Sequence, residues 1–174
     1  MIVLSWHGLE ADSTETCSFD ESEHGILVES TVHGAFGACR YTLFADDHWQ
    51  FRSLSLMLVS QSLQVEFDGT VWTVDGLKRH DLEAARDVDI AVSPLSNTLP
   101  IRRLELAIGE SADITTAYVA VPELTVVTDR QRYTRLATHE YLYESRDSDF
   151  RPVLTVDEHG LVVTYPALFV RVDR

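Results

Sequence analysis

The 174-residue chain has very little lysine and no long apolar run. Lys78 is the only lysine, and 28 acidic residues outnumber 14 basic ones, for a formal net charge of −14. A phosphate backbone needs compensating basic side chains, so this excess of carboxylates argues against nucleic acid as a partner. It disfavours an anionic membrane face for the same reason. Because no apolar run approaches the roughly 20 residues that span a bilayer, we expect no stable membrane insertion.

The acidic surface also bears on the environment in which the protein works. A large acid excess with almost no lysine is typical of proteins adapted to high salt, where salt screens the repulsion between carboxylates. The alternative is an ordinary acidic protein from an arginine-biased genome. Residues 1–12 lack the basic and long apolar regions of a signal peptide and resemble a first strand, so a cytoplasmic location is expected.

Motifs that would identify a reaction or a cofactor are absent as well. The sequence has no GxSxG, Walker loop, GxGxxG or HExxH, and its seven histidines are scattered. Cys17 and Cys39 have no metal-ligand spacing. In a cytoplasmic chain we favour two partly buried free thiols over a disulfide between neighbouring strands. We therefore predict no metal and no cofactor.

What the sequence does contain is alternation of apolar and polar residues, the pattern of β-strands. It predicts strands at 2–6, 15–20, 26–36 and 39–45, and a longer strand after the turn at 46–48. Beyond Gly109, strands are predicted near 113–121, 123–128, 131–136, 139–144, 150–156, 161–165 and 168–172. So many short strands indicate one mainly β domain over residues 1–174, an antiparallel meander curled or closed into a barrel-like shell.

Two hairpins and two short helical segments complete this prediction. Asp68-Gly69 and the residues 157–160 each separate two strand-like segments, and we expect a type I′ turn at Asp68-Gly69. The likeness of the two hairpins suggests an internal duplication. Residues 77–86 have helix propensity but are too short to be more than a connector. A short helix over 98–104 competes with a strand through Leu104, Leu106 and Ile108.

The most specific stretch is 87–106, DVDIAVSPLSNTLPIRRLEL. Asp87 and Asp89 would share one side of a strand, where they could perform acid–base chemistry or bind a cation. We favour the alternative that they neutralise Arg102 and Arg103, since buried arginines are usually paired. The arginine pair could bind an anionic or hydroxylated ligand, or anchor the polar corner at 96–98.

Aromatic residues lie in or beside many of the predicted strands. Tyr141 and Tyr143 share a face, as do Tyr133 and Arg135. Rings on a concave sheet suit contacts with a sugar or a lipid head group, although such residues more often form core and rim.

Taken together, these residues resemble the putative glycolipid-binding family, once catalogued only as a domain of unknown function. The resemblance covers nearly the whole chain and is strongest at 87–90, 93–94 and 97–104. Further matches are Trp6, Arg52, 109–110, 122–124, Gln131, Tyr133, Arg135, Tyr141, Tyr143, 160–162 and 165–166. It implies a curled antiparallel sheet or half-barrel with internal duplication, and no catalytic residues.

The leading hypothesis is a non-enzymatic protein that binds a glycolipid or similar amphipathic molecule. An apolar concave face would hold the chain of the ligand, and polar residues would bind its head group. The candidate ligand-binding residues are Arg102, Arg103, Asp87, Asp89, Asn97, Arg52, Tyr133 and Arg135. One alternative is a hydrolase or isomerase that uses Asp87 or Asp89 as general base. The other alternative is a structural module or a homodimer, whose concave face is filled by its own side chains or by those of a partner copy.

Overall fold

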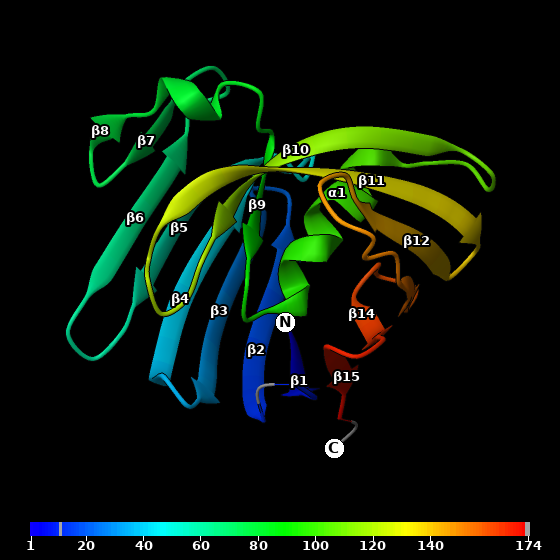
Figure 1. Ribbon diagram of the computed structural model, residues 1–174, viewed down its shortest axis with the longest axis horizontal. Helices are drawn as coiled ribbons and strands as arrows, with labels where there is room; N and C mark the ends of the chain where they lie inside the picture. The colour runs from blue at the N-terminus through cyan, green and yellow to red at the C-terminus, as the bar shows by residue number, and fades with distance from the viewer. Residues whose placement is uncertain (11, 173–174) are drawn as a thin grey trace.

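The computed structural model describes residues 1–10 and 12–172 as a single curled sheet of 15 strands that does not close (Figure 1). The predicted mainly β architecture is therefore confirmed. The strands are β1 (Ile2–Gly8), β2 (Ser13–Ser22), β3 (Gly25–Gly34), β4 (Gly37–Ala45), β5 (Phe51–Met57), β6 (Ser62–Phe67), β7 (Trp72–Val74), β8 (Leu77–Lys78), β9 (Asp87–Ile90), β10 (Ser111–Val119), β11 (Val126–Ala137), β12 (Glu140–Ser145), β13 (Val153–Val156), β14 (Val162–Tyr165) and β15 (Phe169–Arg171).

The strands follow one another as a meander whose first and last members meet in the middle of the sheet. β1 pairs with β15, so β1–β8 form one half of the sheet and β9–β15 form the other. Across the described residues, β9 and β10 are the one parallel pair, and the rest of the ladder is antiparallel. The chain passes from the edge strand β8 to the opposite edge, β9, through a 3₁₀ turn, η1 (His80–Leu82). β9 and β10 run parallel because the long connection over residues 91–110 returns the chain to the end of the sheet where β9 begins.

The inside of the curl is occupied by a short helical segment (Figure 1). It consists of the 3₁₀ turn η2 (Pro94–Asn97) and the helix α1 (Thr98–Leu104). Leu95 and Leu99, each 3% exposed, join the buried cluster of the first half of the sheet. Ile101 joins the cluster formed by Tyr133, Tyr141 and other side chains of the second half. Apolar residues of η2 and α1 thus bridge the two halves.

The segment 77–86 is a connector, as predicted: a two-residue strand is followed by η1, because a stretch this short does not sustain an α-helix. Two local predictions need correction. The segments 123–128 and 131–136 belong largely to one continuous strand, β11. The turn at Asp68 closes between Phe67 and Trp72, and of its residues only Gly69 has positive φ, at +103°, so it is not a type I′ turn, which needs positive φ at both central residues.

Two other predictions agree with the structure. Residues 98–104 are helical, so the competing strand through Leu104 is wrong. Cys17 and Cys39 are both buried and free. Within the described part of the chain, no helix is long and apolar enough to cross a membrane. Internal duplication stays a prediction.

Candidate functional site

The helical segment inside the curl sets the positions of the polar residues singled out in the sequence. Ser93 caps η2 by accepting a hydrogen bond from the amide of Leu95, at 3.2 Å, and Pro94 begins the turn. The chain runs directly into α1, which ends at Glu105 in the left-handed conformation, with φ at +47°. Arg102 and Arg103 therefore lie in the last helical turn.

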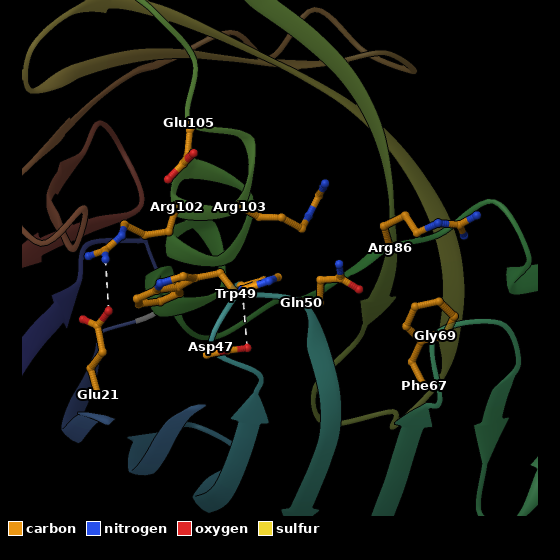
Figure 2. A pocket seen from close by; sticks show the side chains of 11 residues that line it. Glu21, Asp47, Trp49, Gln50, Phe67, Gly69, Arg86, Arg102, Arg103 and Glu105 are labelled. Atoms are coloured by element: carbon orange, nitrogen blue, oxygen red, sulfur yellow. Dashed lines mark hydrogen bonds and ion pairs between the residues drawn. The ribbon is translucent and has the colours of Figure 1, made fainter. Parts of the chain in front are cut away.

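This turn forms one wall of a large cleft, which we call the arginine cleft (Figure 2). Its volume of about 810 Å³ lies in the range of small-molecule sites. The opposite wall is formed by the β4–β5 and β6–β7 connections. Arg86, the residue directly before β9, also lines the cleft. The lining residues are Glu21, Asp47, His48, Trp49, Gln50, Phe67, Gly69, Arg86, Arg102, Arg103 and Glu105.

The two adjacent arginines of this cleft have different partners. Arg103 donates from Nε and Nη2 to the two carboxylate oxygens of Asp87, at 2.9 and 2.6 Å, and Asp87 is fully buried. The predicted neutralisation is right for this pair. Arg102 instead donates to Glu21 at 3.1 Å and to the carbonyl of His159 at 2.9 Å. The prediction that an aspartate of the 87–89 pair neutralises Arg102 is therefore wrong.

Aromatic rings support two of the guanidinium groups in the cleft. The guanidinium carbon of Arg102 lies 4.4 Å from the ring centre of Trp49, and that of Arg86 lies 5.8 Å from the ring of Phe67. Arg86 also donates from Nη1 to the carbonyls of Glu83 and Ala85, at 2.7 and 2.6 Å. The guanidinium groups are thus held in place by contacts that use only part of their donors.

Several N–H groups of the three arginines that line this cleft remain available, although Arg86 and Arg103 also line a neighbouring cleft of about 440 Å³. Nη1 of Arg103, Nε of Arg102, and Nε and Nη2 of Arg86 have no hydrogen-bond partner in the part of the chain that the structure describes. Guanidinium donors of this kind bind carboxylates, phosphates and hydroxyl groups. The arginine cleft can therefore accept an anionic or hydroxylated group.

Asp89 and Asn97 line a second cleft, of about 310 Å³. Asp89 accepts hydrogen bonds from the hydroxyl of Ser96, at 3.0 Å, and from the side-chain amide of Gln131, at 2.7 Å. Asn97 donates to the hydroxyl of Tyr133 at 2.8 Å. Burial raises the pKa of Asp89, and the nearby carboxylate of Asp129 adds to this effect.

The structure thus divides the predicted head-group site between two clefts. Arg102 and Arg103 line one, and Asp89 and Asn97 line the other. The interpretation that Asp89 neutralises an arginine is wrong, because its described partners are a hydroxyl and an amide.

The remaining candidate residues make contacts within the fold. Arg52 forms an ion pair with Asp46 at 2.6 Å. Tyr133 is 1% exposed. Arg135 donates to the carbonyls of Leu106 and Thr138, at 2.9 and 3.1 Å. None of these three side chains lines the two clefts described above.

Sequence reasoning missed several residues of these clefts. Arg86 directly precedes Asp87, so its place beside the specific stretch was a usable signal. Trp49 and Gln50 come from the distant β4–β5 connection, and Asp129 and Phe150 from the second half of the sheet. No local pattern marks these four.

Comparison with known proteins was made for the sequence and for the fold. The family model described as "Putative glycolipid-binding" matches residues 3–171. A crystal structure of a DUF1089 family protein from Pseudomonas aeruginosa is similar, with a TM-score of 0.78 and 34% sequence identity. The match covers 91% of this chain and 92% of that one. No curated protein matches. Since the family model covers nearly all of the sequence, the chain belongs to the putative glycolipid-binding family.

Proposed function

We propose that this protein binds a sugar-bearing amphipathic molecule without converting it, and that the arginine cleft holds the hydroxyl groups of the head. The observation that carries the proposal is that Arg86, Arg102 and Arg103 all line one cleft and each keeps N–H groups without a partner among the described residues. The family description supports the class of ligand.

The charges around the cleft favour a neutral head group over an anionic one. Asp87 balances Arg103, and Glu21 balances Arg102. The acidic side chains of Asp47 and Glu105 also line the cleft, and the whole chain carries a formal charge of −14. Hydroxyl groups use the remaining donors without adding another negative charge. A neutral sugar meets this requirement.

The apolar part of the ligand needs a different place from the one expected from the sequence. The expected concave apolar face is covered by η2 and α1, where Leu95 and Leu99 are buried. An acyl chain along the inner surface of the sheet would have to displace this segment. The proposal is therefore restricted to the head group, with the chain leading away from the cleft.

Calorimetric titration with n-octyl β-D-glucoside, kept below its micelle concentration, tests this proposal. The variants are Arg86→Gln and Arg102→Gln. Arg103 is left unchanged because its loss would leave Asp87 buried without a partner. Removal of hydrogen bonds from a charged donor should weaken binding about tenfold. The matched control is Arg151→Gln, an exposed arginine paired with Glu144 away from the cleft. Binding that is absent in the native chain, or equal in all variants, contradicts the proposal.

A hydrolase or isomerase is the second candidate, with Asp89 as general base. Burial raises the pKa of both Asp87 and Asp89, but Asp87 is held by Arg103, whereas Asp89 lines the second cleft, and this position favours Asp89. A panel of p-nitrophenyl esters and glycosides would reveal turnover, and Asp89→Asn should abolish it. Turnover that persists in Asp89→Asn contradicts this assignment.

A structural module was predicted to contain no cavity of ligand size. The inner face is indeed covered by the protein's own segment, yet the arginine cleft has ligand size. A homodimer stays a prediction, which the solution mass would test.

A further inference from the structure

The cleft beside Asp89 is built differently from the arginine cleft and shares none of its lining residues. We call it the acidic aromatic cleft. Its volume of about 310 Å³ suits a small ring or a short substituted chain. It is lined by Asp89, Ile90, Ala91, Ser93, Asn97, Tyr118, Asp129, Tyr143, Ser145, Ser148, Phe150, Tyr165, Leu168 and Phe169.

Three rings in contact form an aromatic wall of this cleft. The ring centres of Tyr143, Phe150 and Tyr165 lie 6.0–6.1 Å apart in each pair. Tyr143 and Tyr165 are each only 6% exposed. Neither hydroxyl group has a hydrogen-bond partner among the described residues, and neither is fully enclosed. Both tyrosines line the cleft, so each brings an unused hydroxyl group that keeps some exposed surface.

The cleft combines two carboxylates, which only accept hydrogen bonds, with serine and tyrosine hydroxyl groups, which both accept and donate. The side-chain amide of Gln131 donates to both Asp89, at 2.7 Å, and Asp129, at 2.9 Å, which ties the two carboxylates together. No lysine, arginine or histidine is found among the described residues that line the cleft. Asn97 carries the one nitrogen donor among the lining side chains, and it already donates to Tyr133.

Unused carboxylate lone pairs, tyrosine hydroxyls and aromatic rings favour a ligand that donates hydrogen bonds and is positively charged. An ammonium group would donate to the carboxylates and hydroxyls, and would also be attracted by the rings. A neutral sugar would use the hydroxyl groups but would not balance the charge of the two carboxylates, which have no basic side chain beside them among the described lining residues.

We propose that the acidic aromatic cleft is a binding site for a primary ammonium group carried on a small ring or short chain. The carboxylates of Asp89 and Asp129 bind the ammonium group, and Tyr143, Phe150 and Tyr165 pack against the carbon skeleton. The site is independent of the arginine cleft, so either assignment can fail alone.

Benzylamine and benzyl alcohol test this proposal because they have nearly the same shape and differ in charge. Each is titrated into ¹⁵N-labelled native protein, with amide shifts followed by NMR, and glucose is titrated as a third probe. Benzylamine should shift the amides of residues 89–91, 129 and 150, while benzyl alcohol should bind at least about tenfold more weakly. Equal binding of amine and alcohol, no binding of the amine, or preferential binding of glucose in this cleft overturns the proposal.

Two variants locate the interaction. Asp129→Asn removes a charge with little change of shape and should weaken benzylamine binding about tenfold. The matched control is Asp20→Asn, an exposed aspartate outside the cleft, which should bind as the native chain does. Phe150→Ala truncates the 37% exposed ring of the wall and should weaken both aromatic probes. Circular dichroism checks that each variant folds. Unchanged benzylamine binding in folded Asp129→Asn and Phe150→Ala overturns the assignment.

Discussion

Glu15 is a buried carboxylate whose effect on stability can be worked out from the structure. It is 2% exposed on β2, and its Oε1 accepts hydrogen bonds from the hydroxyls of Ser30, Tyr41 and Ser93, at 2.6, 2.6 and 2.8 Å. Its Oε2 has no partner in the described structure. Burial raises the pKa of Glu15 from its ordinary value of 4.5 to about 6, against the opposing effect of the hydroxyls.

The sign and size of the effect follow from proton linkage. Between pH 4.5 and about 6 the folded chain holds a proton on Glu15 that the unfolded chain has lost, so the free energy of unfolding falls as the pH rises. Below this window Glu15 is protonated in both the folded and the unfolded chain, and above it the decrease in the free energy of unfolding is complete. One pKa unit corresponds to about 1.4 kcal/mol, so the ionised carboxylate lowers stability by about 2 kcal/mol at neutral pH.

Glu15→Gln tests this reasoning because the amide keeps the shape and an acceptor oxygen but cannot ionise. Urea unfolding is measured at about pH 4.5 and about pH 7.5 for both chains. The stability of the variant relative to the native chain should rise by roughly 1.5–2 kcal/mol between the two conditions. The control is Glu29→Gln on β3, an exposed carboxylate, which should show almost no such change. A relative stability of Glu15→Gln that is the same at both pH values would refute the reasoning.

Three further predictions concern the helical segment and the surface. Arg103→Met should lower the free energy of unfolding by about 3–5 kcal/mol, because it leaves Asp87 buried without a partner, and Asp87→Leu in the same chain should recover most of that loss in urea unfolding. Gly160→Ala should lower the free energy of unfolding by about 1–2 kcal/mol because of its φ of +76°, and further because the new carbon would lie 3.1 Å from the side chain of Arg102. Gly37→Ala is the control, since its φ is +88° but its added carbon meets open space, so it has the backbone strain alone. Because the chain carries a formal charge of −14, salt should screen the repulsion between its carboxylates, and the melting temperature should rise between about 0.1 and about 1 M NaCl. A melting temperature that does not change would contradict adaptation to high salt.

The fold was largely predictable because its main signals are local. Alternation of buried and exposed residues is nearly regular in β2 and β6, so the strands and their inner faces can be read from the sequence. Helix α1 was also predictable, since Pro100 lies near its start and a polar corner precedes it. The turn at Asp68 was mispredicted because the Asp68-Gly69 dipeptide alone does not show which strand residues pair across the turn. That pair, Phe67 and Trp72, determines which residues lie at the centre of the turn.

The candidate site was only partly predictable because its contacts join distant parts of the chain. Asp87 and Arg103 are 16 residues apart within one unusual stretch, and their pairing was expected. Arg102 reaches Glu21 across 81 residues, and Asp89 reaches Gln131 across 42. Such pairs depend on how the sheet curls around α1, and alternation in a single strand carries no information about the curl.

The same curl explains why two unlike clefts occur beside one short segment. Ser93 is held by Glu15 of the first half of the sheet, and Asn97 is held by Tyr133 of the second half. Arg103, six residues after Asn97, is held by Asp87 of the edge strand β9. A segment fixed at three points to different parts of the sheet cannot shift toward one half without breaking a buried hydrogen bond, which costs about 1–3 kcal/mol. This anchoring preorganises both clefts, so the proposed ligands should bind with little movement of the backbone.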